Sequence, residues 1–220
     1  MRLAGARADV LYYLRMDVKV KICGLTNVED ALAAIEAGAD LLGFVLWEKS
    51  PRHVTFEMAR EIARQLPPGI RRAGVFVDAT VEQVMFSQRI CDFSALQFHG
   101  HESPSFCKQF GIMTIKAFRV RDAASLQAMQ GYDTDAFLLD TEVEGRPGGT
   151  GKTFDWSLAA AAKKFGKPVF LAGGLTPQNV GDALRAVQPF GVDVSSGVES
   201  APGKKDHQKM RDFVAAARAA

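Results

Sequence analysis

The sequence has little cysteine, little net charge and no long apolar run, and each shortage excludes a class of protein. Three cysteines in 220 residues, an odd number, argue against a disulfide framework and indicate a reducing compartment, so we expect a cytoplasmic protein. The net charge is +2 and the charges are scattered, so no basic stripe indicates nucleic acid. No apolar run approaches the ~20 residues of a membrane-spanning helix. The four histidines and three cysteines show no paired zinc-ligand spacing.

A chain of this length, with 47% apolar residues, can form one large domain around a substantial core. Residues 1–17 do not fit the pattern that follows them. Their apolar patch, Val10 to Leu14, is too brief for a signal-peptide core, and Met16 would serve as a start. We expect an N-terminal extension at 1–17, poorly ordered or loosely helical, and a catalytic domain at 18–220.

Eight apolar runs of strand length alternate with eight stretches of helical spacing. The expected strands are 18–23, 41–46, 72–77, 94–98, 112–117, 136–139, 169–172 and 191–194, and the expected helices are 28–37, 55–66, 80–90, 103–110, 122–130, 155–164, 176–187 and 205–219. In the first strand Val18, Val20 and Ile22 alternate with polar neighbours, but as a set the strands are apolar runs rather than alternating ones, which is typical of parallel strands covered on both faces. Eight units of roughly 25 residues predict an α/β fold, a single (β/α)₈ barrel at the short end of its size range. The second candidate is a doubly wound open sheet, but Cys23 to Thr26 is not its glycine-rich phosphate turn.

Cys23 stands at the carboxyl end of the first expected strand, where Gly24 turns the backbone and Thr26 or Asn27 can cap the next helix. In parallel α/β folds this edge is where ligands bind and chemistry occurs. Cys23 therefore becomes a candidate that faces a substrate. The competing interpretation is a small buried hydrophobe, which is how we interpret Cys91 and Cys107.

Two glycine-containing turns follow the last two strands. Gly173 and Gly174 end the seventh, and Ser196 and Gly197 follow the eighth. In (β/α)₈ barrels these loops often bind a phosphate through backbone N–H groups, and glycine lets the phosphate approach them. The pair of turns predicts a phosphate site.

The loop at 141–154 contains a stretch, Gly148 to Thr153, that looks like a nucleotide-binding P-loop. The motif requires a glycine where Arg146 stands, and the stretch follows the sixth strand. We expect instead a loop over the mouth of the barrel, with Lys152 available to an anion.

The motifs at the strand ends closely resemble those of the phosphoribosylanthranilate isomerases of tryptophan biosynthesis, and the resemblance covers Val18 to the last helix. They are KICGLT at 21–26, GFV with SPR at 43–52, LQFHG at 96–100, LLD at 138–140, GGTGKTFDW at 148–156, LAGGLTPQNV at 171–180 and DVSSGVE at 193–199. The resemblance implies a (β/α)₈ barrel without metal or organic cofactor. It implies conversion of N-(5-phosphoribosyl)anthranilate, a small-molecule substrate, to 1-(2-carboxyphenylamino)-1-deoxyribulose 5-phosphate by an Amadori rearrangement. A monomer is expected, with a dimer as the alternative.

The resemblance also assigns roles to residues. Cys23 matches the general base, Asp140 the general acid, and Arg52 the arginine that receives the anthranilate carboxylate. Gly173, Gly174, Ser196 and Gly197 fall in the phosphate-binding turns, while His99 and Asp193 match polar residues at the barrel mouth. An Amadori rearrangement needs one acid and one base at different points around the sugar. A thiol with a pKa of about 8.5 must ionise to act as a base, and burial would raise the pKa of an aspartic acid toward neutrality.

Alternatives remain at this point. Asp140 would otherwise be a helix cap, Arg52 a solvated loop residue, and His99 a core or supporting hydrogen-bonding residue. The aminoaldose isomerase of histidine biosynthesis catalyses the same rearrangement on a related barrel. That enzyme is expected to use two aspartates, one of them at the end of the first strand, so the presence of Cys23 at this position argues against it. A non-catalytic sugar-phosphate-binding barrel would keep the phosphate turns without needing Cys23 and Asp140.

Overall fold

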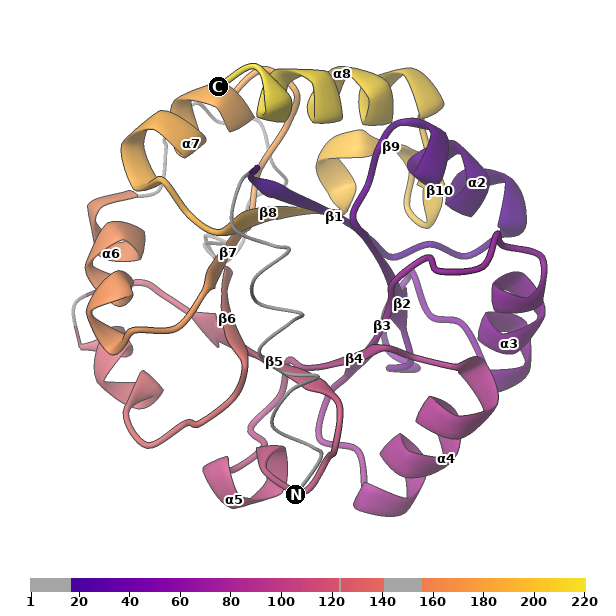
Figure 1. The fold of residues 1–220 in the computed structure, drawn as a ribbon, viewed down its shortest axis with the longest axis horizontal. Coiled ribbons are helices and arrows are strands. Elements are labelled where there is room, and N and C mark those ends of the chain that lie inside the picture. The colour runs from indigo at the N-terminus through magenta and orange to yellow at the C-terminus, as the bar shows by residue number, and fades with distance from the viewer. Residues whose placement is uncertain (1–16, 123, 141–155) are drawn as a thin grey trace.

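The computed structural model describes residues 17–122, 124–140 and 156–220. Eight parallel strands form a closed barrel in which each strand pairs with the next and β8 pairs with β1, as Figure 1 shows in a view along the barrel. The strands are β1 (Lys19–Cys23), β2 (Leu41–Val45), β3 (Arg72–Phe76), β4 (Ala95–Phe98), β5 (Met113–Arg119), β6 (Ala136–Asp140), β7 (Val169–Ala172) and β8 (Gly191–Val194). The predicted (β/α)₈ barrel is confirmed.

Helices surround the barrel and follow the strands around the ring (Figure 1). They are α2 (Val28–Glu36), α3 (Phe56–Arg64), α4 (Val81–Cys91), α5 (Pro104–Cys107), α6 (Trp156–Ala161), α7 (Val180–Val187) and α8 (His207–Arg218), with short 3₁₀ turns η1 (Ser125–Met129), η2 (Ala162–Phe165) and η3 (Ser196–Val198). Side-chain caps set several starts: Asn27, Thr55 and Thr80 each accept a hydrogen bond from a backbone N–H of the first turn. Local chemistry therefore fixes where these three helices begin.

Several expected helices differ from the structure, and the stretch 103–110 forms only the short α5. The stretch 122–130 forms only the short η1 rather than a helix. The helix expected from Thr176 begins at Val180, because Asn179 accepts from the Thr176 N–H and donates to the Gly174 carbonyl, which holds this segment as a turn. The segment before α8 is a small antiparallel hairpin, β9 (Glu199–Ala201) and β10 (Lys204–Lys205), and Asp206 caps the helix that follows.

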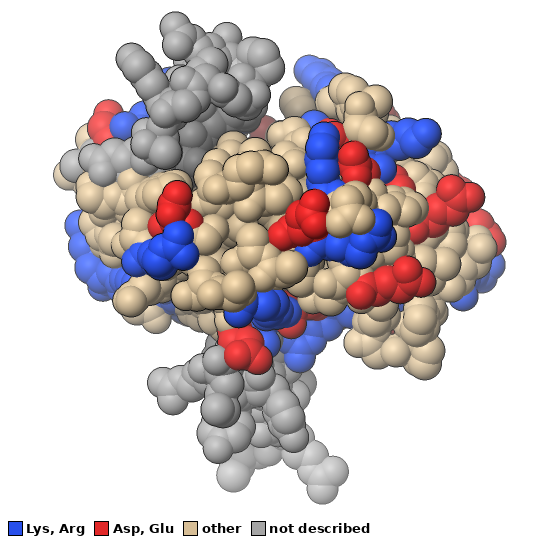
Figure 2. Space-filling model, turned by 90° about the horizontal axis from the view of Figure 1, so that it is seen from above, with Lys and Arg blue, Asp and Glu red and all other residues tan. Residues whose placement is uncertain are grey.

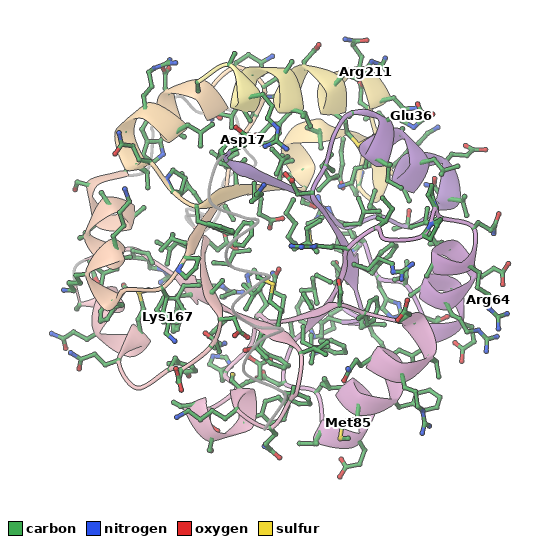
Figure 3. All side chains as sticks on the ribbon, viewed as in Figure 1. Asp17, Glu36, Arg64, Met85, Lys167 and Arg211 are labelled. Carbon is green, nitrogen blue, oxygen red and sulfur yellow. The ribbon has the colours of Figure 1, made fainter. Side chains whose placement is uncertain are left out.

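Two apolar layers hold the barrel. Alanine, leucine, isoleucine and phenylalanine side chains fill part of its interior, namely Leu41, Ala73, Ala95, Ile115, Ala117, Ala136, Leu138, Phe170 and Ala172. A larger cluster packs the outer faces of the strands against the helices. Figure 3 shows side chains filling the ring, whereas the labelled Glu36, Arg64, Met85 and Arg211 lie on its outer side. Buried polar side chains also occur on the strands, among them Lys21, Gln97 and Asp193.

The closing pair of strands joins the two ends of the chain. Lys21 is in register with Asp193 where β1 meets β8. The Arg218 side chain at the end of α8 donates to the carbonyls of Val18 and Gly38 and pairs with Asp40 at 2.6 Å. The last helix thus fastens the start of the first strand.

The described surface is mixed in charge. On the face shown in Figure 2, positive and negative side chains are interspersed. Within 17–122, 124–140 and 156–220, no helix is long and apolar enough to cross a membrane.

Candidate active site

Cys23 ends β1 and is buried, and its surroundings are mostly charged. Lys21 lies two residues earlier on the same strand, and its Nζ donates to Oδ1 of Asp193 over 2.9 Å. Gly43 on β2 provides the space: a Cβ there would lie 2.7 Å from the Cys23 sulfur and 2.9 Å from Lys21 Nζ. The predicted base therefore sits beside a buried ammonium–carboxylate pair.

Burial dominates the electrostatics of this thiol. It raises the pKa of Cys23, an effect that Asp193 reinforces and that the cations Lys21 and Lys205 oppose. Burial alone would lower the pKa of Lys21, but Asp193 and Cys23 outweigh it, so the pKa of Lys21 is raised. The resting site thus holds a neutral thiol against a charged lysine, and that lysine would stabilise a thiolate as it forms.

Asp140 ends β6, on another side of the ring from β1 (Figure 1). Its Oδ2 lies 3.2 Å from Nε2 of His99, whose Nδ1 lies 3.1 Å from the amide nitrogen of the buried Gln97. With the Gln97 amide in this orientation its N–H donates to Nδ1, which places the ring proton on Nε2, directed at Asp140; the opposite amide orientation would reverse the two roles. His99 is therefore a neighbour of the predicted acid, not of the predicted base.

Arg52 lies in the loop after β2 and is held by a buried carboxylate. Its Nε and Nη2 donate to Oε1 and Oε2 of Glu199, each over 2.7 Å. Burial raises the pKa of Glu199, but hydrogen bonds from Arg52 and Lys205 outweigh it and hold the pKa below its usual range. A Cβ on Gly24 would lie 2.6 Å from Arg52 Cδ, so the arginine stem covers the residue next to Cys23. Arg52 is not a loosely solvated residue.

The two glycine turns touch each other. Gly173 and Gly174 have φ of +83° and +63°, values that side chains rarely adopt. A Cβ on Gly197 would lie 1.8 Å from the Leu175 carbonyl oxygen, so only glycine permits this approach. Ser196 is exposed and opens η3. The structure therefore brings the predicted phosphate turns together at the carboxyl ends of β7 and β8.

Not every predicted residue can be placed. Lys152 and the loop at 141–154 lie outside the described residues. In the described ranges, no group of three or more His, Cys, Asp or Glu residues is arranged to hold a metal ion. A separate hollow of about 470 Å³ lies against the loops after β2 and β3, and it is lined by residues 46–49, 53–57, 76–79 and Gln83. None of the predicted site residues lines it.

Sequence reasoning missed three partners of the site. Glu199 appeared only within a matched motif, Lys205 only as the start of a helix, and Gln97 only as part of a strand. The Pro-Gly dipeptide at Pro202 and Gly203 was an available signal, because such dipeptides mark turns and here it joins β9 to β10. No local pattern indicates that Gln97 faces a histidine.

A closed (β/α)₈ barrel with a thiol, a carboxylate and an anchored arginine at the carboxyl ends of its strands defines a barrel enzyme of acid–base chemistry. The family model described as N-(5'-phosphoribosyl)anthranilate (PRA) isomerase matches residues 20–216. This chain belongs to the N-(5'-phosphoribosyl)anthranilate isomerase family.

Named relatives and solved structures agree with this assignment. The isomerase of Geotalea uraniireducens is 54% identical over 91% of this chain and 98% of its own, and that of Geobacter metallireducens is 52% identical over 92% and 100%. The crystal structure of the Thermotoga maritima isomerase is 42% identical, with a TM-score of 0.87 over 92% of this chain and all of that one. A phosphoribosyl anthranilate isomerase bound to reduced 1-(o-carboxyphenylamino)-1-deoxyribulose 5-phosphate is 40% identical, with a TM-score of 0.83 and the same coverage.

Proposed function

We propose that this protein converts N-(5-phosphoribosyl)anthranilate to 1-(2-carboxyphenylamino)-1-deoxyribulose 5-phosphate in tryptophan biosynthesis, with Cys23 as base and Asp140 as acid. The observation that carries the proposal is the placement of a thiol on β1 and a carboxylate on β6 at one rim of the barrel, in a chain 54% identical to a named isomerase. A substrate between these strands meets an acid and a base from different sides.

The chemistry proceeds in two proton transfers. Asp140 protonates the furanose ring oxygen, and the ring opens to an iminium. Cys23, as thiolate, then removes the proton on C2 to give an enolamine, which tautomerises to the ketone. Lys21 stabilises the thiolate that this step requires, since its positive charge acts to lower the pKa of the Cys23 thiol. The hydrogen bond from His99 positions the Asp140 carboxyl group.

The two ends of the substrate are held by separate groups in this proposal. Arg52 receives the anthranilate carboxylate, which suits a guanidinium fixed beside Cys23. Backbone amides of the turns at 173–174 and 196–197 receive the phosphate. The positive φ of both Gly173 and Gly174 supports this role, since it leaves the peptide face open to an anion.

A fluorescence assay tests the proposal directly. Freshly made phosphoribosylanthranilate is mixed with the purified protein, and we expect its fluorescence to fall enzymatically much faster than in buffer. The aminoaldose substrate of the histidine-pathway isomerase is the comparison, and we expect no comparable turnover of it. Binding of phosphoribosylanthranilate without turnover would favour a non-catalytic sugar-phosphate-binding barrel and would refute the enzyme assignment.

We also propose that one barrel forms the complete catalytic unit in the cytoplasm, because all proposed site residues lie on one chain and the thiols are unpaired. The Thermotoga maritima relative is described as dimeric, in a structure of monomers generated from it. Light scattering at assay concentration, combined with specific activity across a dilution series, measures the state of this protein. An activity that falls on dilution would contradict the single-barrel unit.

A further inference from the structure

We propose that Glu199 is a positioning residue for Arg52: its buried carboxylate fixes the guanidinium in the direction that receives the substrate carboxylate. The inference rests on the proposed function of Arg52 as the anthranilate-binding residue. It assigns a role to the β9–β10 hairpin, which otherwise stands outside the barrel architecture.

The contact between Glu199 and Arg52 is bidentate, and the two side chains differ in how far they are exposed. Nε and Nη2 donate to the two carboxylate oxygens, each over 2.7 Å. The Glu199 side chain is only 6% exposed, whereas that of Arg52 is 22% exposed. The anchor is therefore inside the protein, and the anchored group reaches the surface of the mouth. A two-point contact fixes the plane of the guanidinium as well as its position.

Glu199 is itself held from several directions. Lys205 Nζ donates to its Oε1 over 2.8 Å, and Lys209 Nζ donates to its backbone carbonyl over 2.9 Å. The hairpin turn is fastened to the start of the chain, because Thr26 Oγ1 donates to the Gly203 carbonyl over 2.6 Å. The carboxylate has little freedom to follow the arginine, so the arginine is placed by the carboxylate.

The charges around Glu199 favour an anionic ligand. Arg52 and Lys205 both pair with this one carboxylate, so among these three side chains two cations face one anion. A substrate carboxylate on Arg52 would add a second anion to these three groups. Glu199 thus holds Arg52 in place while Arg52 can still attract a second anion.

Holding Arg52 in advance lowers the cost of binding. An arginine has several rotatable bonds, and ordering them on binding opposes affinity. The Glu199 clamp, with the contact of Arg52 Cδ against Gly24, orders them beforehand. Loss of the clamp should therefore appear mainly as weaker binding and not as slower proton transfer.

The test combines Glu199→Gln, Arg52→Ala, their double variant and Arg52→Lys, with Ser200→Ala as the matched control. Ser200 is in the same hairpin, and its Oγ donates a hydrogen bond to the Lys204 carbonyl rather than to Arg52. Each variant is assayed for KM and kcat with phosphoribosylanthranilate. Equilibrium binding of anthranilate is measured as well, because anthranilate carries the carboxylate but no phosphate and its binding does not depend on turnover. Aniline, which lacks the carboxylate, is the comparison ligand.

We expect Glu199→Gln to raise KM and to weaken anthranilate binding on the order of tenfold, with kcat within a few-fold of the parent. In the Arg52→Ala background the same change should have almost no further effect, since the clamp has nothing left to hold. Arg52→Lys, which keeps the charge at this partly buried position but cannot be clamped at two points, should bind anthranilate nearly as weakly as Arg52→Ala. Aniline binding and the Ser200→Ala variant should match the parent.

Additive losses in the double variant, parental binding by Glu199→Gln, or full binding by Arg52→Lys would each overturn the positioning role. If Glu199→Gln does not fold, Arg52→Lys alone decides the question. A parent that binds anthranilate through this clamp but does not turn over phosphoribosylanthranilate would refute the proposed function while keeping the role of Glu199.

Discussion

Replacing Cys23 by alanine is the sharpest perturbation of the proposed chemistry, because it removes the proposed base and almost no volume. General-base assistance is typically worth 10²–10⁴ in rate, or about 3–5 kcal/mol of barrier. The lost sulfur costs about 1 kcal/mol of stability as buried apolar volume, compared with the 5–15 kcal/mol that holds an ordinary domain. The variant should therefore be folded and nearly inactive, with KM close to the parent value.

The pH dependence tests the same assignment independently. Burial raises the pKa of the Cys23 thiol, so the free enzyme holds a neutral thiol near pH 7. Below that pKa the thiolate fraction rises tenfold for each pH unit, and the low-pH limb of kcat/KM should rise with the same slope. Thiolate absorbance at 240 nm, taken as parent minus Cys23→Ala, gives the pKa directly. A difference titration that does not match the kinetic limb would refute the reasoning.

The decisive measurement is kcat of Cys23→Ala at the parent's optimum pH. Circular dichroism and a thermal melt confirm the fold, and inhibition by inorganic phosphate confirms the remaining site. If kcat stays near the parent value, Cys23 is a structural residue and the base lies elsewhere. His99 would not be a simple replacement, because it already bonds Asp140.

Further predictions concern the acid, the phosphate turn, the N-terminal segment and the other thiols. Asp140→Asn should lower kcat by roughly 10²–10⁴ at little cost in KM; a kcat near the parent value would remove it as the acid. Gly174→Val should weaken competitive inhibition by inorganic phosphate while the fold survives, since φ of +63° costs about 1–2 kcal/mol in strain and no atom lies within 4 Å of the new Cβ; equal inhibition would move the phosphate elsewhere. Deleting residues 1–15 should leave turnover and Tm unchanged, because every described strand starts at Lys19 or later; a large loss of either would show that the segment supports the barrel. Burial raises the pKa of Cys91 and of Cys107 to about 11, so the folded state binds these protons more tightly than the unfolded chain. Stability should be intact below about pH 8.5 and fall as pH rises toward 11 in urea titrations; a flat profile would contradict this.

The strands were predictable because each is a short apolar run that ends at a glycine or a polar residue. The positions of Cys23 and Asp140 at the rim could be inferred for this reason, since each ends such a run and parallel strands bring their carboxyl ends together, whereas the role of Asp140 came from the family resemblance. The starts of α3 and α4 were equally local, since Thr55 and Thr80 cap them by their own side chains. What depends on neighbours in sequence could be inferred from sequence.

The partners of the site residues depend on contacts across the fold. Glu199 meets Arg52 over a separation of 147 residues, and Asp193 meets Lys21 over 172. No local pattern reports which of several acidic residues reaches a given arginine. The expectation that α7 begins at Thr176 was wrong for a related reason. The Asn179 side chain hydrogen bonds the Thr176 N–H and the Gly174 carbonyl, which holds this segment as a turn. The need for glycine at Gly43 also appears only once the thiol is seen beneath it.

Closure of the barrel by β1 and β8 has a consequence for how this protein becomes active. The Lys21–Asp193 pair, the Arg52–Glu199 clamp and the Thr26–Gly203 bond all join the first quarter of the chain to the last. Such distant contacts form late, because the long intervening loop must first be closed at an entropic cost. In a chain emerging from the ribosome, Cys23 therefore lacks the neighbouring Lys21–Asp193 pair and Arg52 lacks its contact with Glu199 until the last strands are released. We therefore expect catalytic activity to appear only after the barrel has closed.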